Sequence, residues 1–185
     1  MHPLFNKKVC EVNVLNNFEI PFKGLSFGAH EYEFTINDSF FEAITYSEIT
    51  QGQLICTILL ENNPGMMQLE FTIRGTVKLI CDRCVEEFDY PIECHEILIV
   101  KTGPETKEES DEVIIIAYNE TKLLLWQYIY EFISLQVPYR KVHPDDENGN
   151  STCNLEQIER IVKLSSTSDT DPRWDALRNI QLDND

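Results

Sequence analysis

The residues with the clearest chemistry are two cysteines separated by two positions, Cys81 and Cys84. A tight turn brings two such sulfurs to one side of the chain, where both can hold the same tetrahedral metal ion. Two further residues of suitable type lie downstream, His143 and Cys153. The four residues together predict one structural zinc ion with three cysteine ligands and one histidine ligand. Because 58 residues separate Cys84 from His143, the spacing is not that of a short zinc finger.

Other interpretations of the cysteines stay open at this point. Cys94 and His95 offer substitute ligands. Cys81 and Cys84 could instead cap a β-hairpin and pack as small apolar side chains, without a metal. A thioredoxin-like redox pair requires the first cysteine at the N-terminus of a helix, but here a strand pattern follows the pair. A zinc enzyme would require an open coordination position at the ion.

The net charge restricts the kind of partner that the protein can bind. The 185 residues include 15 Lys and Arg and 32 Asp and Glu, so the formal net charge is −17. Such a field opposes binding to a nucleic-acid backbone or to an anionic membrane, because both are negatively charged. A basic protein partner is favoured. Common nucleotide-binding, zinc-protease and serine-hydrolase motifs are absent, so we expect no enzymatic activity.

The N-terminal residues suggest where the protein works. Lys7 and Lys8 are not followed by the apolar stretch of a signal peptide, and no apolar run is long enough to span a bilayer. We therefore expect a cytoplasmic protein that makes no contact with a membrane. In that compartment the six cysteines should be reduced thiols.

Alternating apolar and polar residues predict that strands dominate the first hundred positions. The expected strands cover residues 18–22, 32–36, 53–60, 67–79 and 88–94. A short helical turn is expected after Asp38, a tight turn at 62–65, and a β-bulge at Gly75. Because short turns join the strands, the sheet should be mainly antiparallel.

The pattern changes to helical spacing in the second half of the chain. An acidic loop is expected at 103–112 and a short strand at 113–118, followed by helices over 121–136 and from Asn154 onward. The fold class is thus α+β, with a curved, largely antiparallel β-sheet or partly open barrel and one long and two shorter helices in the C-terminal half. We expect one domain over residues 1–164. Residues 165–185 should form a polar linker and a short C-terminal amphipathic helix that begins at Asp171 and Pro172.

Two features could bind a partner. The short last helix has little core of its own, so Trp174 and Leu177 are candidates for docking on the domain or on a partner. Arg140 and Lys141 form the densest basic stretch of the chain, and could contact RNA locally despite the net charge.

Several segments resemble a known family when they are taken in order. Residues 81–88 (CDRCVEEF) are similar to its C-x-R-C segment, and residues 130–138 (YEFISLQVP) to its helix-ending E-x-I-x-L-x-x-P pattern. His143, Cys153 and a DPRWDAL tail at 171–177 follow in the same order. The family is that of the YceD-like proteins, named for accumulation of large-subunit ribosomal RNA. The segment 20–30 resembles its bacteroidete branch.

The resemblance implies a non-enzymatic role in the synthesis, processing or stability of large-subunit (23S) rRNA, and brings no catalytic residues. Combined with the net charge, it suggests that the protein binds a basic ribosomal protein or a large-subunit precursor, so that contact with rRNA is indirect or local. The alternatives are a direct rRNA-binding module, or a zinc-dependent structural or redox protein. The three hypotheses differ in whether binding survives nuclease treatment and in whether a metal is present.

Overall fold

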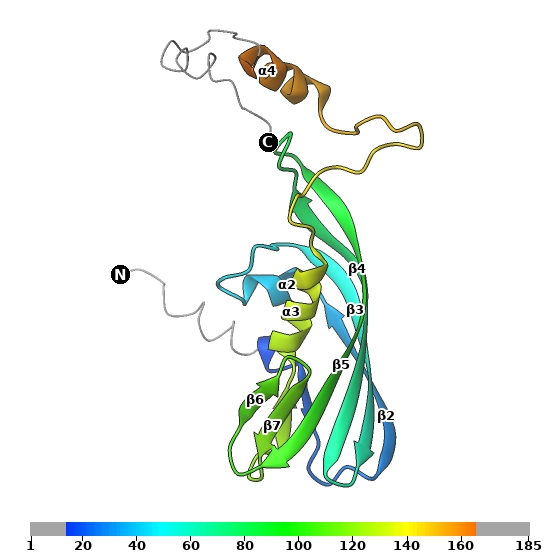
Figure 1. The fold of residues 1–185 in the computed structure, drawn as a ribbon, viewed down its shortest axis with the longest axis vertical. Coiled ribbons are helices and arrows are strands. Elements are labelled where there is room, and N and C mark those ends of the chain that lie inside the picture. The colour runs from blue at the N-terminus through cyan, green and yellow to red at the C-terminus, as the bar shows by residue number, and fades with distance from the viewer. Residues whose placement is uncertain (1–13, 166–185) are drawn as a thin grey trace, which may run out of the picture. The chain divides into compact units, whose positions relative to one another are not determined.

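The computed structural model of the chain describes residues 14–165, which form an α+β fold. The larger sheet has six strands in the order β2-β3-β4-β5-β7-β6. These strands are β2 (Gly28–Ile36), β3 (Gly52–Asn63), β4 (Met66–Ile80), β5 (Glu87–Gly103), β6 (Lys107–Ser110) and β7 (Val113–Ala117). Every neighbouring pair is antiparallel except β5 and β7. The predicted fold class is confirmed, and the curved sheet does not close on itself (Figure 1).

The remaining elements are short. Strands β1 (Glu19–Pro21) and β8 (Lys122–Leu124) pair as a separate two-stranded sheet. The helices named in the described part are α2 (Asp38–Glu42), α3 (Trp126–Gln136) and α4 (Leu155–Ser165). The third helix expected from the sequence, near residue 172, lies outside the described residues.

The chain divides into two compact units. Of the described residues, the first comprises 14–80 and 87–141, and we call it the sheet unit. The second comprises 81–86 and 142–165, and we call it the cysteine unit. It therefore combines the connection between β4 and β5 with the chain that follows α3. The predicted domain boundary at residue 165 falls where the described residues end and stays a prediction.

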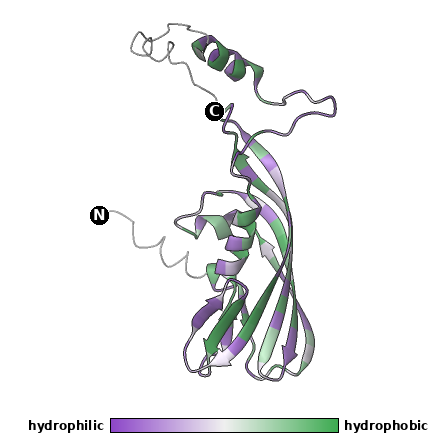
Figure 2. Cartoon of the chain, viewed as in Figure 1, coloured by the Kyte–Doolittle hydropathy of each residue, from purple (hydrophilic) through white to green (hydrophobic). Residues whose placement is uncertain are grey.

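The core of the sheet unit lies between the large sheet and the helices α2 and α3, which lie on one side of it (Figure 1). In β4 the alternating residues Met67, Leu69, Phe71 and Ile73 are buried. Figure 2 shows hydrophobic and hydrophilic positions along the strands of the sheet. Phe132 of α3 places its ring 5.2 Å from that of Phe71. Each such side chain contributes roughly 1.5–3 kcal/mol by leaving water, so this face fixes the register of the sheet.

The bulge predicted at Gly75 is wrong, because β4 keeps an unbroken register with both of its neighbours. Gly75 lies opposite Leu54 and Ile92 with a φ of +153°. A Cβ atom at this position would lie 2.2 Å from the carbonyl oxygen of Gln53. Glycine is therefore required for the close approach of two backbones and not for an inserted residue.

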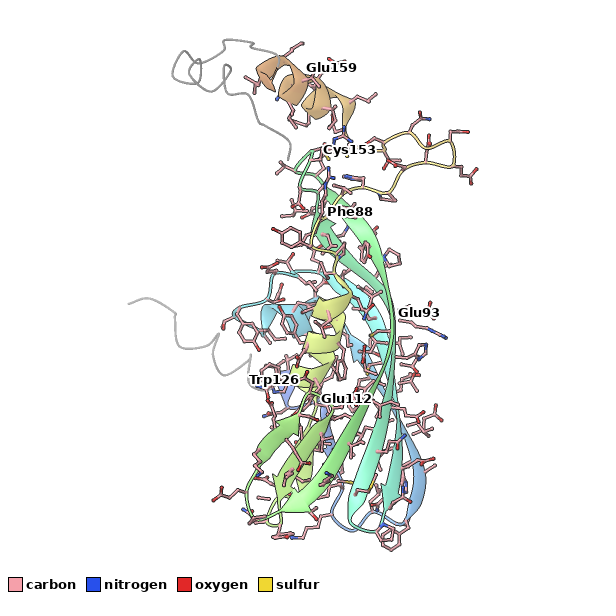
Figure 3. The ribbon with its side chains drawn as sticks, in the orientation of Figure 1. Phe88, Glu93, Glu112, Trp126, Cys153 and Glu159 are labelled. Carbon is pink, nitrogen blue, oxygen red and sulfur yellow. The ribbon has the colours of Figure 1, made fainter. Side chains whose placement is uncertain are left out.

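Two other expected boundaries differ from the structure. Residues 107–110 of the expected acidic loop form β6, which pairs with β7 while its side chains stay exposed. The long helix begins at Trp126, which Figure 3 labels, and not near Thr121. Residues 122–124 extend instead as β8, because this satisfies the backbone of β1.

Candidate metal centre

Cys81 and Cys84 lie in the tight connection that follows β4. The amide of Cys81 donates a hydrogen bond to the carbonyl of Glu86, and the amide of Val85 donates to the carbonyl of Cys81, each at 2.9 Å. The amide of Arg83 also donates to the Cys81 sulfur at 3.4 Å. To complete this turn Val85 adopts a φ of +62°, which is unfavourable for a β-branched residue. The backbone thus holds both sulfurs on one side, as their spacing predicts.

A closed hairpin-like loop brings Cys153 back to His143. Asp145 and Ser151 form an isolated antiparallel bridge across its base. Inside the loop, the Asp146 carboxylate accepts hydrogen bonds from the amides of Asn148 and Asn150 at 2.9 and 2.7 Å. These bonds hold the pKa of Asp146 below its usual value. The loop between His143 and Cys153 is therefore compatible with a shared site, because its two ends meet.

Helix α4 begins at Leu155, and Asn154 lies between it and Cys153 as the cap that the sequence pattern predicts. The side-chain oxygen of Asn154 accepts hydrogen bonds from the amides of Glu156 and Gln157 at 2.9 and 3.3 Å, which caps the helix. Its side-chain nitrogen donates to the Glu86 carboxylate at 2.5 Å. Asn154 therefore ties the C-terminal segment to the Cys81–Glu86 turn next to the cysteines.

The four candidate ligands lie together within the cysteine unit. The sulfurs of Cys81, Cys84 and Cys153 and a ring nitrogen of His143 all lie within 4.8 Å of one another. The sulfurs of Cys81 and Cys153 are 3.8 Å apart. The Nδ1 atom of His143 lies 3.4 Å from the Cys84 sulfur and 3.8 Å from the Cys153 sulfur.

These distances fit the ligand shell of a single tetrahedral ion. With Zn–S bonds of about 2.3 Å and Zn–N bonds of about 2.0 Å, tetrahedral angles place two sulfurs about 3.8 Å apart and a sulfur and a nitrogen about 3.5 Å apart. The four side chains could therefore bind a metal ion. A set of four protein ligands leaves no open position on a tetrahedral ion, which is typical of structural sites.

The electrostatic environment favours a metal-binding thiolate at Cys81. Burial raises the pKa of this thiol, but hydrogen bonds from the amides of Cys84 and Arg83 and from His143 outweigh that effect and lower the pKa to about 6. The pKa of Cys153 is raised: a hydrogen bond from Ser151 opposes the shift, but burial and the neighbouring sulfurs of Cys81 and Cys84 outweigh it. When three thiols lie this close, the negative charge of one thiolate disfavours ionisation of the other two. A bound cation would remove this repulsion.

The cysteine unit has almost no hydrophobic core. Its only buried apolar residues within the described ranges 81–86 and 142–165 are Cys81, Cys84 and Cys153. In contrast, the larger apolar residues of α4 are not buried: Ile158 is half-buried, and the others are exposed, namely Leu155, Ile161, Val162 and Leu164. The buried interior of this unit therefore consists mainly of the candidate metal ligands, and not of packed apolar side chains.

The substitute ligands do not join this cluster. Cys94 and His95 are neighbours in β5 of the sheet unit, where Cys94 is buried and His95 is exposed. Thr72 and the Nδ1 atom of His95 lie 3.1 Å apart. Burial raises the pKa of Cys94 to about 11 and that of Cys56 to about 12, so both stay neutral thiols.

The other candidate binding residues are not brought into one site. Lys141 forms a 2.9 Å ion pair with Glu48, while Arg140 is exposed. Trp174 and Leu177 lie outside the described residues. Their roles in binding stay predictions. The polar residues that support the cluster, Ser151 and Asn154, were not identified as such from the sequence, where Asn154 gave only a helix-capping signal.

Within the described residues, no helix is both long and apolar enough to cross a membrane. No curated protein and no solved structure matches the chain. The segment 20–30 lies outside the family match given below, so the resemblance to a bacteroidete branch stays a prediction.

The model of the family described as "Large ribosomal RNA subunit accumulation protein YceD" matches residues 69–181. The match covers more than half of the 185 residues and includes all four candidate metal ligands. The chain therefore belongs to the YceD family, whose description assigns it to the accumulation of large-subunit ribosomal RNA.

Proposed function

We propose that this protein is a non-enzymatic factor in the biogenesis of the large ribosomal subunit and acts by binding a basic ribosomal protein. The observation that supports this most is the combination of the family with a net charge of −17. An acidic protein that is needed for rRNA accumulation but is repelled by the phosphate backbone should bind the positively charged proteins of the large ribosomal subunit. Its carboxylates can cover the Lys and Arg side chains of a ribosomal protein until rRNA displaces them.

The distribution of charge in the sheet unit is consistent with this role. Strands β2 and β3 contain no Lys or Arg and expose three glutamates, Glu31, Glu33 and Glu61. The Lys and Arg side chains of β4 and β5 are already engaged in ion pairs. Arg74 pairs with Glu93 at 3.0 Å, Lys78 with Asp89 at 3.3 Å, and Lys101 with Glu109 at 2.7 Å. Figure 3 shows Glu93 projecting from the side of the sheet opposite α3.

Direct binding of RNA has weaker support. The predicted basic stretch consists of Arg140 and Lys141, and Glu48 neutralises Lys141 locally. A surface for an RNA backbone usually needs several unneutralised Lys and Arg side chains along one face. Arg140 alone does not supply such a surface.

The metal is proposed to be a structural zinc ion. The donor set of three sulfurs and one imidazole nitrogen suits Zn²⁺ better than Mg²⁺ or Ca²⁺, which prefer oxygen ligands. Its role would be to hold the cysteine unit folded, since four protein ligands leave no coordination position for a substrate. The proposal therefore includes no catalytic step.

A binding experiment tests the proposed function. The purified protein is immobilised and exposed to large-subunit ribosomal proteins from which the RNA has been removed by nuclease. We expect basic ribosomal proteins to be retained at low salt and released as the ionic strength rises, because screening weakens the attraction. The double charge reversal Arg140→Glu with Lys141→Glu should leave this retention unchanged. Retention that requires intact RNA, or that does not depend on salt, would contradict the proposal.

A further inference from the structure

The two edges of the large sheet differ in a way that bears on binding. At one edge, β6 has only four residues and a register shift between Glu108 and Ser110. Short, irregular, charged edge strands are a usual protection against pairing with other chains. At the other edge, β2 has nine residues in unbroken register with β3, from Gly28 opposite Asn62 to Ile36 opposite Leu54 (Figure 1). No strand within residues 14–165 pairs with its outer side.

Side chains on the inner face of β2 are incompletely covered. Tyr32 and Phe34 are half-buried, whereas their partners in β3, Ile58 and Cys56, are fully buried. The ring of Phe34 also packs against that of Phe18, and the two ring centroids are 5.6 Å apart. The core of the sheet unit therefore ends at β2 with apolar side chains that one further strand would cover.

Side chains on the outer face of β2 have a single sign of charge. Glu31 and Glu33 are both exposed, and no Lys or Arg within residues 14–165 forms an ion pair with either of them. Glu61 of β3, which lies opposite Ala29, adds a third carboxylate on the same face. A strand placed beside β2 would meet carboxylates on its outer face and half-buried aromatic rings on its inner face.

We propose that β2 is a docking edge for an extended segment of a basic protein, in which Lys or Arg alternates with apolar residues. This inference rests on the proposed function and specifies where and how that partner would bind. In such strand addition, main-chain hydrogen bonds provide affinity and alternate side chains provide specificity. The basic side chains pair with Glu31 and Glu33, and the apolar side chains cover Tyr32 and Phe34.

The same charges argue against a second copy of this chain as the occupant. Antiparallel pairing of two β2 edges would bring the glutamates of one copy close to those of the other. Like charges at cross-strand positions destabilise a sheet. The edge therefore selects for the charge of its partner, admitting a basic segment and excluding an acidic one.

A synthetic peptide tests this docking edge in the full-length protein. The probe is a nine-residue peptide of alternating lysine and valine, and its binding is followed by fluorescence anisotropy. A peptide of the same composition, with the valines and lysines in two separate blocks, is the first control. We expect the alternating peptide to bind at least about tenfold more tightly, because only this order places lysine and valine on opposite faces of a strand. Equal affinity of the two peptides would contradict strand addition.

Backbone pairing is tested separately by N-methylation. Two versions of the alternating peptide carry N-methyl groups on alternate residues, one on the odd and one on the even positions. A strand uses the amides of one edge only, so one version should lose binding and the other should keep it. Binding by both versions would show that the attraction is only electrostatic and would refute the inference.

Charge reversal locates the site on the protein. The double variant Glu31→Lys with Glu33→Lys should lose at least about tenfold in affinity for the alternating peptide, since both carboxylates face it. The matched control is Glu156→Lys with Glu159→Lys on α4, which changes the net charge equally and should retain binding. If both double variants lose affinity to the same degree, the edge is not the docking site.

Two further results would show that a different segment pairs with the outer edge of β2, and would overturn the inference. The first is a gain in peptide affinity on deletion of residues 1–13, which would show that this chain's own N-terminal segment competes for the edge. The second is a dimer of the wild-type protein that the Glu31→Lys, Glu33→Lys variant disrupts.

The same variant separates this inference from the proposed function. If the wild-type protein and the Glu31→Lys, Glu33→Lys variant retain basic ribosomal proteins equally, the docking edge is wrong and the proposed function stands. If the wild-type protein retains none but binds the alternating peptide, the proposed function fails and the edge remains a site for basic segments.

Discussion

Removal of the metal should unfold the cysteine unit and leave the sheet unit folded. The perturbation is a chelator of zinc, applied under reducing conditions so that the thiols cannot form disulfides. A variant that removes one ligand, His143→Ala, should have the same effect without a chelator. The matched control is His95→Ala, which removes an exposed histidine of β5 that lies outside the cluster.

The size of this effect can be estimated from the small hydrophobic core of the cysteine unit. Ordering the backbone of the 12 residues 142–153 costs roughly 1–2 kcal/mol each, or about 12–24 kcal/mol in total. The buried apolar groups of the unit are three cysteine side chains, so burial offsets little of this cost. A structural zinc ion contributes about 10–16 kcal/mol and is thus the largest favourable contribution. Its loss should lower the protection of these amides from hydrogen exchange by at least about 10³-fold.

Hydrogen exchange followed by mass spectrometry measures this effect by segment. We expect peptides from 142–153 to exchange rapidly after chelation or in His143→Ala, and peptides from β3 and β4 to remain protected. Metal analysis of the untreated protein should give one zinc ion per chain. Much less than one ion per chain, or slow exchange of 142–153 in the chelated protein, would refute the reasoning.

Three further predictions concern stability. Gly75→Ala should lower the free energy of unfolding by about 3 kcal/mol or more, because the added Cβ would clash with the Gln53 carbonyl. Gly65→Ala has open space around the added Cβ and should lower it by about 1 kcal/mol. Urea unfolding of the two variants measures this difference. Burial raises the pKa of the Cys56 thiol in the folded protein to about 12, so the unfolded chain loses this proton at a lower pH than the folded protein does. The free energy of unfolding should therefore fall by up to about 1.4 kcal/mol per pH unit above pH 9. This slope should be smaller in Cys56→Ala. Val85→Gly should stabilise the metal-bound turn by about 1 kcal/mol by relieving the positive φ, measured as a slower loss of zinc to a competing chelator; faster loss would contradict this.

The sequence predicts the strands well because their side chains report burial directly. In β4 every second residue from Met67 to Val77 is buried apart from Gly75, so period two is visible in the residue types. The start of α3 is not predictable in this way, because residues 122–124 become a strand only by pairing with a distant segment, β1. Long-range pairing of this kind overrides local preference.

The candidate metal centre shows the same division between local and long-range information. The spacing of Cys81 and Cys84 is a local signal, and the turn that holds them is local as well. That His143 and Cys153 lie beside them depends on the Asp145–Ser151 bridge, whose hydrogen bonds no spacing rule reveals. The sequence marks Gly75 as an unusual strand position but predicts a bulge there, because only the paired strands show that the backbone of Gln53 approaches it.

The discontinuity of the cysteine unit has a consequence for synthesis of the chain. Cys81 and Cys84 leave the ribosome first, and Cys153 follows 69 positions after Cys84. At a synthesis rate of about 5–20 residues per second, roughly 3–14 s pass between the synthesis of Cys84 and that of Cys153. During this time the first two ligands are present without the full set of four. The centre can close only after β5, β7 and α3 have all been made. A fragment that begins at Val142 would carry two of the four ligands, so the centre cannot be produced apart from the strands that separate its halves.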